Sequence, residues 1–372
     1  MNHSDYMQMA LRLARRGLGS TAPNPSVGCV LVKGGQIVGR GWTQPGGRPH
    51  AEAMALAQAS NAARGATAYV TLEPCAHFGV TSPCADALID AGIARVVIAC
   101  SDPDPRTAGK GIMRLAAAGI ETHHGICEAD ARALNAGFLQ RIEKNRPFVS
   151  LKLATSLDGM IATAGGESQW ITGEKARQHA HLLRAEHDAI LTGIGTALAD
   201  DPMLNCRVPG REAHSPIRIV LDTHLRLPIT SQLVQSATEI PLWMICSESA
   251  AATHSFPAHI TVIAMPQLQP AAIMETLAER GITRLLIEAG PTLNTSFYES
   301  GLMDEIHWYR APLVIGASGR SAWNIAPAAL NDIQRWKSHP CVALGQDQWQ
   351  RFTPNARANQ ASCHGWLKHC QH

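Results

Sequence analysis

Hydrophobic positions in the first third of the chain alternate between helical and strand-like periods. Residues 5–17 place apolar side chains at positions 7, 10, 11, 13 and 14, which is the spacing of an amphipathic helix ending near Gly17 and Gly19. The run SVGCVLVKGGQIVGRGW predicts a β-hairpin with Gly34-Gly35 at its turn. Further along, the pattern predicts helices over 50–63, 83–91, 109–118 and 128–142, and strands over 68–72 and 95–100. This alternation favours a sheet with helices on both faces.

The polar segment EKNRP at 143–147 interrupts this pattern and predicts a domain boundary. After it, the pattern predicts strands near 148–154, 188–193, 217–222, 241–246, 260–264, 284–288 and 305–313, and helices over 173–184, 270–280 and 292–300. We therefore expect two α/β domains, at 1–145 and 147–353, followed by a C-terminal extension at 354–372 that has no clear period. A chain of 372 residues is long enough to bury two cores.

Composition narrows the possible partners and the compartment. Hydrophobic residues make up 45% of the chain and charged residues 17%, as in globular proteins, and the formal charge of +2 argues against a nucleic-acid-binding surface. The ten cysteines are scattered, no apolar run has the length of a membrane span, and the first residues lack the apolar core of a signal peptide. We expect a cytoplasmic protein with no membrane or nucleic-acid partner, in which clustered cysteines bind metal or catalyse.

Three residues have the types and order of a zinc site. His50 opens the triplet His-Ala-Glu, and two cysteines follow prolines, at Cys75 after a predicted strand and at Cys84 before a predicted helix. The run Ser82-Pro83-Cys84 predicts an N-cap followed by the first two helical residues, so that the thiol faces the positive end of the helix dipole. Two thiolates and one imidazole give three protein ligands, and catalytic zinc keeps its fourth position for water.

Glu52 has the position of a proton carrier beside this zinc. The motif His-x-Glu followed by Pro-Cys and a second cysteine is the signature of zinc deaminases, although eight residues rather than two separate the cysteines here. We predict that Glu52 accepts the proton of the attacking water and delivers it to the leaving group. A structural zinc with His77 or Cys100 as fourth ligand is the alternative, and the tail residues Cys363, His364, His369 and Cys370 could chelate metal adventitiously.

Phosphate-binding turns are suggested in the second half of the chain. An apolar strand enters Gly193-x-Gly195-Thr196, and another strand ends in Glu288 before Gly290 and a helix. Glycines after a strand let backbone N–H groups approach phosphate, but the third glycine of the dinucleotide fingerprint is absent. Read alone, these glycines serve equally well as turn residues.

The first half resembles a known family. The segments TAPNPSVGCVLV, HAEA, VTLEPCAHFG and SPCADALI resemble the deaminase domain of the bifunctional riboflavin-biosynthesis deaminase/reductases, in the cytidine-deaminase superfamily. The resemblance covers about residues 1–145 and implies a three-layer α/β/α domain, one zinc on His50, Cys75 and Cys84, and Asn24 near the pyrimidine. Val80 stands where the family usually has Arg or Lys, and Asp104 where Asn is usual, which would weaken binding of the ribose phosphate.

The second half resembles the reductase domain of the same family, which is similar to dihydrofolate reductase. The segments LKLATSLDGMIA, GESQWIT, LLRAEHDAILTGIGTALADDPMLNCR, RIVLDT and EAGPTL carry this resemblance over about residues 147–353. It implies NADPH near Ala154, Trp170, Thr196, Asp200, Thr223, Gly290, Pro291, Thr292, Leu293, Asn294 and Thr295. It implies the substrate near Ser168, Arg184, Leu204, Arg207 and Glu288.

The chemistry of those residues is consistent with the roles that the resemblance implies. Arg184 and Arg207 can bind a ribose phosphate bidentately, and hydride would pass from the nicotinamide to C1 of the sugar. Either Lys152 or Glu288 could polarise or protonate the substrate, and the sequence does not distinguish them. Thr223 replaces the more usual Ser and keeps the hydroxyl.

We consider two functions, of which the first follows from both resemblances and the second keeps only the zinc deaminase. The first is deamination of 2,5-diamino-6-(5-phosphoribosylamino)pyrimidin-4-one, followed by NADPH-dependent reduction of the ribosyl group of 5-amino-6-(5-phosphoribosylamino)uracil to ribityl. The alternative is a zinc deaminase acting on RNA or nucleosides, with the second half as a binding domain. The small net charge and the 5% aromatic content weigh against that alternative. The family also implies a homo-oligomer, a dimer or larger.

Overall fold

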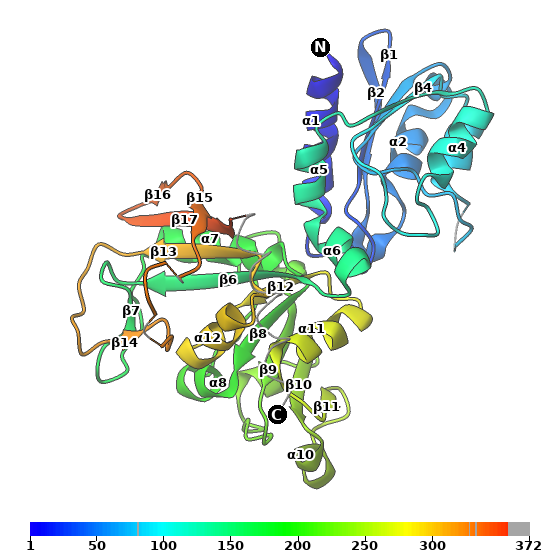
Figure 1. Ribbon diagram of the computed structural model, residues 1–372. Helices are drawn as coiled ribbons and strands as arrows, with labels where there is room; N and C mark the ends of the chain where they lie inside the picture. The colour runs from blue at the N-terminus through cyan, green and yellow to red at the C-terminus, as the bar shows by residue number, and fades with distance from the viewer. Residues whose placement is uncertain (80–81, 327, 332, 356–372) are drawn as a thin grey trace, which may run out of the picture. The chain divides into compact units, whose positions relative to one another are not determined.

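The computed structural model describes residues 1–79, 82–326, 328–331 and 333–355 (Figure 1). The chain forms two compact units. The first unit comprises Met1–Pro147 together with Leu277–Thr283, and the second comprises Phe148–Thr276 together with the described residues from Arg284 onward. Among the helices that the structure describes, none combines the length and the hydropathy needed to span a bilayer.

A mixed sheet with the strand order β2-β1-β3-β4-β5 forms the centre of the first unit. Its strands are β1 (Gly28–Lys33), β2 (Gln36–Trp42), β3 (Thr67–Val70), β4 (Arg95–Ile98) and β5 (Glu121–His124). β1 pairs antiparallel with β2 and β3, whereas β3, β4 and β5 are parallel. The predicted hairpin is confirmed, because β1 and β2 are joined by Gly34 and Gly35, both with positive φ.

Helices cover both faces of this sheet (Figure 1). They are α1 (His3–Ala14), α2 (Ala51–Ala59), α3 (Cys84–Asp90), α4 (Lys110–Ala117), α5 (Glu128–Leu134) and α6 (Ala136–Lys144). α1 and α5 lie on one side, and α2 and α4 on the other. Two glycines allow these helices to pack closely on the sheet. A Cβ at Gly28 of β1 would lie 1.9 Å from the carbonyl oxygen of Ala10 in α1, and one at Gly41 of β2 would lie 2.1 Å from that of Ala51 in α2.

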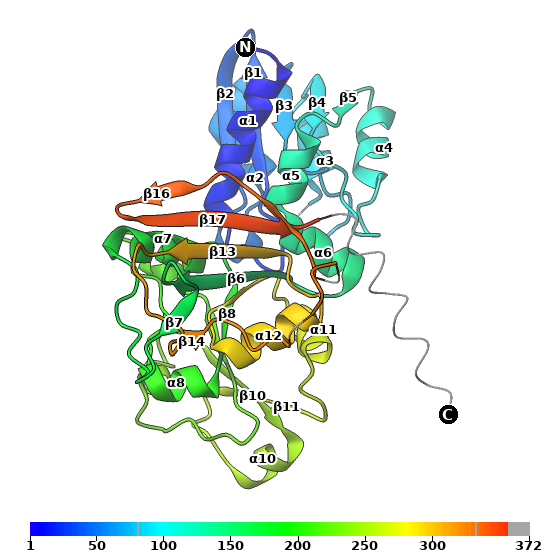
Figure 2. The same ribbon diagram turned by 60° about the vertical axis from the view of Figure 1, so that its left-hand side comes forward.

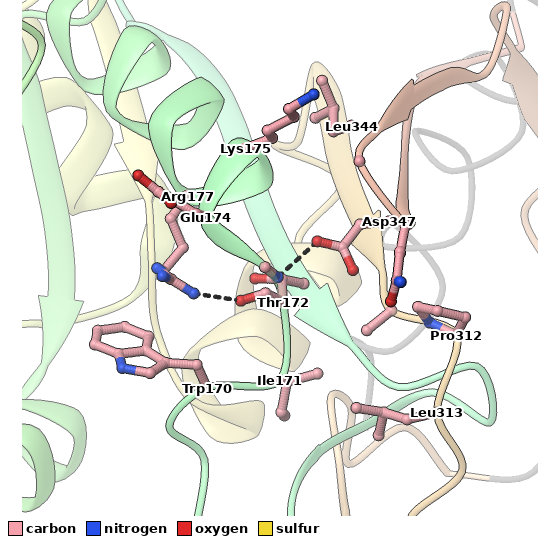
Figure 3. A pocket seen from close by; sticks show the side chains of 14 residues that line it. Trp170, Ile171, Thr172, Glu174, Lys175, Arg177, Pro312, Leu313, Leu344 and Asp347 are labelled. Atoms are coloured by element: carbon pink, nitrogen blue, oxygen red, sulfur yellow. Dashed lines mark hydrogen bonds between the residues drawn. The ribbon is translucent and has the colours of Figure 1, made fainter.

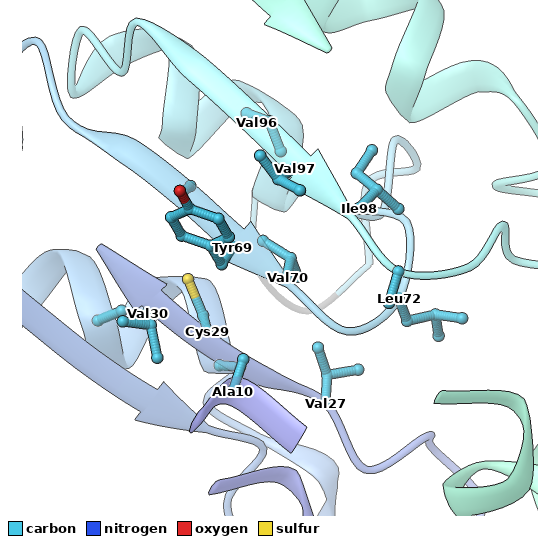
Figure 4. Close-up of a cluster of buried hydrophobic side chains, with 14 of the residues drawn as sticks. Ala10, Val27, Cys29, Val30, Tyr69, Val70, Leu72, Val96, Val97 and Ile98 are labelled. Atoms are coloured by element: carbon cyan, nitrogen blue, oxygen red, sulfur yellow. The ribbon is translucent and has the colours of Figure 1, made fainter. Parts of the chain in front are cut away.

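The core of the first unit is built from the central strands. Figure 4 shows side chains of β1, β3 and β4 gathered beside Ala10 of α1. Val30, Val70 and Val97 are fully buried there. This packing holds in place the strand ends, from which the loops with the candidate functional residues begin.

Two helix predictions in the first unit need correction. The helix expected over 128–142 is two helices, which are separated at Asn135 because this residue leaves helical geometry (φ −93°, ψ 17°) and its side chain accepts the N–H of Ser26. Ser82 is not the N-cap of α3: Pro83 is the N-cap and Cys84 the first helical residue. β5 was not expected, because the sequence Glu-Thr-His-His carries little apolar signal.

The second unit contains a larger sheet with the order β11-β10-β9-β8-β12-β6-β13-β17-β15, and β16 pairs with β17. From β11 to β13 all neighbours are parallel, whereas β17 is antiparallel to β13. Figure 2 shows β6, β13 and β17 side by side. The strands are β6 (Phe148–Thr155), β8 (Ala189–Gly193), β9 (Ile217–Leu221), β10 (Leu242–Ser247), β11 (Thr261–Met265), β12 (Arg284–Ile287), β13 (Glu305–Arg310), β15 (Trp336–Ser338), β16 (Val342–Leu344) and β17 (Asp347–Pro354).

The strands expected from β6 to β13 are confirmed, apart from end residues. Helices connect the parallel strands: α7 (Glu174–Ala185), α8 (Ile194–Asp200), α9 (Gln232–Gln235), α10 (Glu248–Thr253), α11 (Pro270–Glu279) and α12 (Pro291–Glu299). A small ladder joins β7 (Met160–Ala162) to β14 (Arg320–Ser321). The carboxyl ends of the parallel strands all lie at the same end of the sheet, which is where α/β proteins bind their ligands.

Near the amino ends of the parallel strands, a buried carboxylate is surrounded by hydrogen-bond donors and cations. Glu305 is 4% exposed and accepts hydrogen bonds from Ser150 Oγ at 2.8 Å and His307 Nε2 at 2.9 Å. Arg351 Nη1 lies 3.6 Å away and Arg284 Nη2 3.9 Å. Burial alone would raise the pKa of Glu305, but His307, Arg284 and Ser150 together hold that pKa well below its usual range.

Removing this carboxylate is expected to destabilise the second unit. Glu305→Ala leaves the largely buried Arg284 and the partly exposed Arg351 without this counter-charge. Breaking a fully buried pair costs about 3–5 kcal/mol, and we expect a smaller loss here because solvent reaches Arg351. Because the folded-state pKa is lowered, the stabilisation by Glu305 is present above the unfolded value and is lost as the pH falls through the folded value. The difference between wild type and variant is therefore expected at pH 7 and should shrink in acid.

Thermal unfolding followed by tryptophan fluorescence measures this difference, because Trp308 and Trp349 lie in the same unit. Glu275→Ala, at an exposed position of α11, is the matched control and should leave the transition unchanged. An equal shift in both variants would contradict the role given to Glu305.

Candidate active sites

The three predicted zinc ligands come together at the ends of three elements of the first unit. His50 is the N-cap of α2, Cys84 begins α3, and Cys75 lies in the loop after β3. The Nδ1 atom of His50 lies 3.2 Å from the Sγ of Cys84 and 3.7 Å from the Sγ of Cys75. All three donor atoms lie within 4.8 Å of one another.

These distances fit a tetrahedral zinc ion. With Zn–S near 2.3 Å and Zn–N near 2.0 Å, tetrahedral angles separate neighbouring ligand atoms by about 3.5–3.8 Å. Of the described residues, no other His, Cys, Asp or Glu group has such a geometry. His77, considered as a fourth ligand, pairs with the hydroxyl of Thr107 at 3.3 Å, and Cys100 donates to the carbonyl of Thr71. The chain therefore provides three zinc ligands here, which leaves a coordination position for water.

The same cluster favours a thiolate at one cysteine. The hydrogen bond from the Cys84 thiol lowers the pKa of Cys75 to about 4, with further contributions from His50 and the backbone N–H of Cys84, which lies 3.3 Å from the sulfur. The Cys84 pKa is raised, first because its thiol donates to Cys75 and then because of burial. Metal binding displaces these protons, since zinc binds thiolates.

Glu52 lies in the first turn of α2 and is only 3% exposed. Burial raises the pKa of its carboxyl, while the neighbouring His50 opposes that shift and a hydrogen bond with Cys84 also lowers it. An acid in this position, next to two zinc ligands and out of bulk water, has the setting of a group that takes up and releases a proton during a reaction.

Glu73 is a residue of this site without a sequence pattern of its own. Its buried carboxylate accepts backbone N–H bonds from Gly109 at 3.1 Å, Gly111 at 3.0 Å and Ile112 at 3.3 Å. It thereby fastens the segment leading to Cys75 onto the N-terminus of α4. An acidic residue directly after a buried strand, in the run VTLEPC, is the only signal that could have found it.

The remaining predicted features of the deaminase unit have mixed outcomes. Asn24 is half-buried, and its Nδ2 lies 3.5 Å from the carbonyl oxygen of Gly47, in the turn before His50. Asp104 does not add a lone negative charge, because Arg106 donates to both of its carboxylate oxygens and lowers its pKa. Val80 lies outside the described residues, as do Cys363, His364, His369 and Cys370.

In the second unit, all the predicted cofactor residues except Trp170 lie at or just after the carboxyl ends of the parallel strands, several of them in the first turns of the helices that follow. Ala154 is near the end of β6, Thr223 follows β9, Thr196 and Asp200 are in α8, and Gly290 is the N-cap of α12. Pro291, Thr292, Leu293, Asn294 and Thr295 form the first turns of α12. The start of α8 lies close to the turn after β12, since a Cβ added at Gly290 would lie 3.5 Å from the hydroxyl of Thr196.

An ion-pair cluster lies at the same end of the sheet. Arg184 Nε and Nη2 donate to the two carboxylate oxygens of Glu288 at 2.8 and 2.9 Å, and Lys152 Nζ lies 3.7 Å from Glu288. Burial would raise the pKa of Glu288, but Arg184 and then Lys152 outweigh it and lower that pKa to about 2. Glu288 is therefore a carboxylate at neutral pH.

Arg207, the second predicted arginine, is exposed and is not part of this bidentate pair. Its Nε donates to Nε2 of His181 at 3.1 Å. Leu204, three residues earlier, is buried and adopts a positive φ of 49°, which is uncommon for a residue other than glycine. His181 was not expected in this site, because a single histidine on a helix has no distinguishing pattern.

Ser168 and Trp170 lie in the loop between β7 and α7, and Trp170 lines a pocket together with Thr172 and Asp347 (Figure 3). Arg177 covers the Trp170 ring with its guanidinium 4.6 Å from the ring centroid, and the indole is 64% exposed. Asp347, at the start of β17, accepts the N–H of Gly173 at 2.6 Å. The unpredicted strand β17 therefore anchors the loop that carries Trp170.

The first unit is an α/β fold with a three-donor metal cluster, and the second is a larger α/β fold with charged residues at the carboxyl ends of its parallel strands. Residues 1–100 match the cytidine and deoxycytidylate deaminase zinc-binding region, and residues 147–347 match the RibD C-terminal domain. The chain belongs to the RibD family of riboflavin biosynthesis proteins, and it is a bifunctional deaminase and reductase.

Individual relatives support this assignment over nearly the whole chain. The riboflavin biosynthesis protein RibD of Escherichia coli K12 is 44% identical over 335 residues, which cover 86% of this chain and 90% of the relative. A crystal form of Acinetobacter baumannii RibD matches with a TM-score of 0.86 and 42% identity, covering 95% of this chain and 99% of that one. A Thermotoga maritima diaminohydroxyphosphoribosylaminopyrimidine deaminase/5-amino-6-(5-phosphoribosylamino)uracil reductase matches with a TM-score of 0.87, 32% identity and the same coverage.

Family membership confirms the predicted fold of both units, a cytidine-deaminase-like domain and a reductase domain similar to dihydrofolate reductase. It also confirms the predicted function, the deaminase and reductase steps of riboflavin biosynthesis. His50, Cys75 and Cys84 form the zinc-binding site of the deaminase, and the reductase domain implies a nicotinamide cofactor.

Proposed function

We propose that the deaminase unit acts on 2,5-diamino-6-(5-phosphoribosylamino)pyrimidin-4-one. The reductase unit then reduces the ribosyl group of 5-amino-6-(5-phosphoribosylamino)uracil to ribityl with NADPH. The observation that carries the deaminase half is the three-donor cluster with Glu52 buried beside it. The Thermotoga relative named above, which is described by these two activities, supports the choice of substrates.

In the deamination, zinc supplies the Lewis acidity that makes a bound water nucleophilic. Glu52 would accept a proton from that water as the new C–O bond forms at the ring carbon and the π electrons of the ring C=N bond move to the ring nitrogen, from which the C=N bond re-forms when the amino group leaves. Glu52 would then deliver a proton to the amino group, which leaves as ammonia when the C–N bond breaks. The raised pKa of Glu52 suits this double role, because a carboxyl group must be able to hold the proton between the two transfers.

In the reduction, NADPH supplies the hydride. The hydride would form a bond to C1 of the ribose as the bond from C1 to the ring oxygen breaks, and the electron pair left on that oxygen would take up a proton. Glu288 is ionised and cannot supply this proton. We assign the proton to the ammonium group of Lys152, which Glu288 holds at 3.7 Å. Of the two alternatives that the sequence left open, we therefore propose Lys152.

The cofactor contacts remain those implied by the family resemblance. NADPH would bind along Ala154, Trp170, Thr196, Asp200 and Thr223, with its pyrophosphate at the N-terminus of α12, formed by residues 290–295. Substrate would contact Asn24 in the deaminase unit. In the reductase unit it would contact Ser168, Arg184, Leu204, Arg207 and Glu288. The limits of the domains at 1–145 and 147–353, the cytoplasmic location and a homo-oligomeric state stay predictions.

Product analysis tests this assignment. Purified protein loaded with one equivalent of zinc is incubated with the diaminopyrimidine ribose phosphate, with and without NADPH. With NADPH we expect one ammonia released per NADPH oxidised, and without it the reaction should stop at the deaminated ribosyl compound. NADH in place of NADPH is the cofactor control. Ammonia release from cytidine or RNA, but not from this substrate, would favour the alternative function instead.

A further inference from the structure

Within the part of the chain that the structure describes, Arg207 is hydrogen-bonded through one nitrogen only. Its Nε donates to Nε2 of His181 at 3.1 Å, and its side chain is exposed. Among the described residues, neither of its terminal Nη atoms has a partner. A guanidinium held at Nε keeps both terminal nitrogens available for the oxygens of a phosphate.

His181 is buried on α7 and is fixed in one protonation state by its neighbours. Because Nε2 accepts from Arg207, the proton of the neutral ring is on Nδ1, which lies 3.1 Å from the carbonyl oxygen of Asn205 and donates to it. Burial, with Arg184 and Arg207 nearby, lowers the pKa of His181 to about 4. The ring is therefore neutral at physiological pH and can accept the hydrogen bond from Arg207.

Arg184 is already occupied by other groups. Its Nε and Nη2 bind Glu288, and its Nη1 donates to the carbonyl oxygen of Asn205 at 3.0 Å, the same oxygen that His181 contacts. Binding a phosphate bidentately would require Arg184 to give up Glu288. The two predicted arginines thus differ: Arg184 orients Glu288, and Arg207 has free donors for a ligand.

We propose that His181 is a positioning residue that holds the guanidinium of Arg207 toward the 5-phosphate of the reductase substrate. This inference rests on the proposed function, because it assumes a phosphorylated substrate in the reductase unit. His181 itself need not touch the substrate. It acts through the single hydrogen bond to Nε, which sets the plane of the guanidinium.

Two amide variants separate this role from a merely structural one. His181→Asn places an amide N–H near the position of Nδ1, so that the bond to Asn205 is kept while the acceptor for Arg207 is lost. His181→Gln places an amide oxygen near Nε2 and so keeps an acceptor for Arg207. Arg207→Met removes the phosphate ligand itself. Melting temperature and NADPH affinity report whether each variant is folded.

Steady-state reduction is measured with 5-amino-6-(5-phosphoribosylamino)uracil and with its dephosphorylated riboside. Losing a charge-assisted hydrogen bond in Arg207→Met is expected to raise KM for the phosphorylated substrate by about 10–100-fold. His181→Asn should raise that KM by about tenfold, with kcat and the riboside kinetics unchanged. His181→Gln should have a KM for the phosphorylated substrate close to that of the wild type. His181→Asn combined with Arg207→Met should be no worse than Arg207→Met alone.

The possible failures are distinguishable. If Arg207→Met is selective for the phosphorylated substrate but His181→Asn slows both substrates equally, the inference about His181 is wrong and the proposed function stands. If Arg207→Met shows no selectivity, both the phosphate contact and the inference are wrong. If the wild-type protein does not reduce the phosphorylated substrate at all, the proposed reductase function fails.

Discussion

Glu52→Gln is expected to lower the rate of ammonia release by about 10²–10⁴-fold, the range typical for loss of a general acid–base group. The amide has the size of the carboxyl but can neither accept the proton of the water nor deliver it to the leaving amino group. The zinc ligands are untouched, so the variant should still contain zinc. Its reductase activity should be normal when the deaminated substrate is supplied.

Three measurements on the same preparation check this expectation: zinc content, ammonia release, and NADPH oxidation with deaminated substrate. Asp90→Asn makes the same chemical change at an exposed position of α3 and should have no effect on any of them. Normal ammonia release by Glu52→Gln would remove Glu52 from the mechanism. Loss of zinc along with activity would instead assign it a role in metal binding.

The zinc site could be predicted from the sequence because its chemistry is concentrated in short motifs. His50 and Glu52 lie two residues apart at a helix start, and each cysteine follows a proline next to a predicted element. Order along the chain and residue type were sufficient there. The prediction failed only on a detail of the capping, since Cys84 is the first and not the second residue of α3.

The parallel strands of the second unit were also predictable, because strands buried on both faces read as continuous apolar runs. β17 was not, since the sequence Asp-Gln-Trp-Gln-Arg-Phe-Thr-Pro is half-exposed along most of its length and carries many polar side chains. Its pairing with β13 comes from tertiary structure rather than from local pattern. Asp347 therefore could not be connected to the Trp170 loop in advance.

The pairing of polar residues in the reductase unit could not be predicted from the sequence either. Arg184 and Glu288 are 104 positions apart, and only the fold determines that they form a bidentate pair. The sequence supplied both residues as substrate contacts by resemblance, but not their effect on each other. That effect is chemical, because the pair ionises Glu288 and leaves Lys152 as the proton source proposed here.

Lys152→Met is accordingly expected to lower kcat for NADPH oxidation with the deaminated substrate by about 10²–10⁴-fold. Methionine keeps much of the length of the side chain but has no proton to give to the ring oxygen as the C1–O bond breaks. NADPH affinity should change little, and ammonia release by the deaminase unit should not change. Lys337→Met, at an exposed position of β15, is the matched control.

The comparison with Glu288→Gln separates proton donation from electrostatic support. If Lys152 is the donor and Glu288 holds it in place, Lys152→Met should be the more damaging change, and Glu288→Gln should retain part of the turnover. Stopped-flow oxidation of bound NADPH, recorded before product release, isolates the chemical step. Full activity in Lys152→Met with loss in Glu288→Gln would reverse the assignment, because the proton would then have to pass through the carboxyl of Glu288.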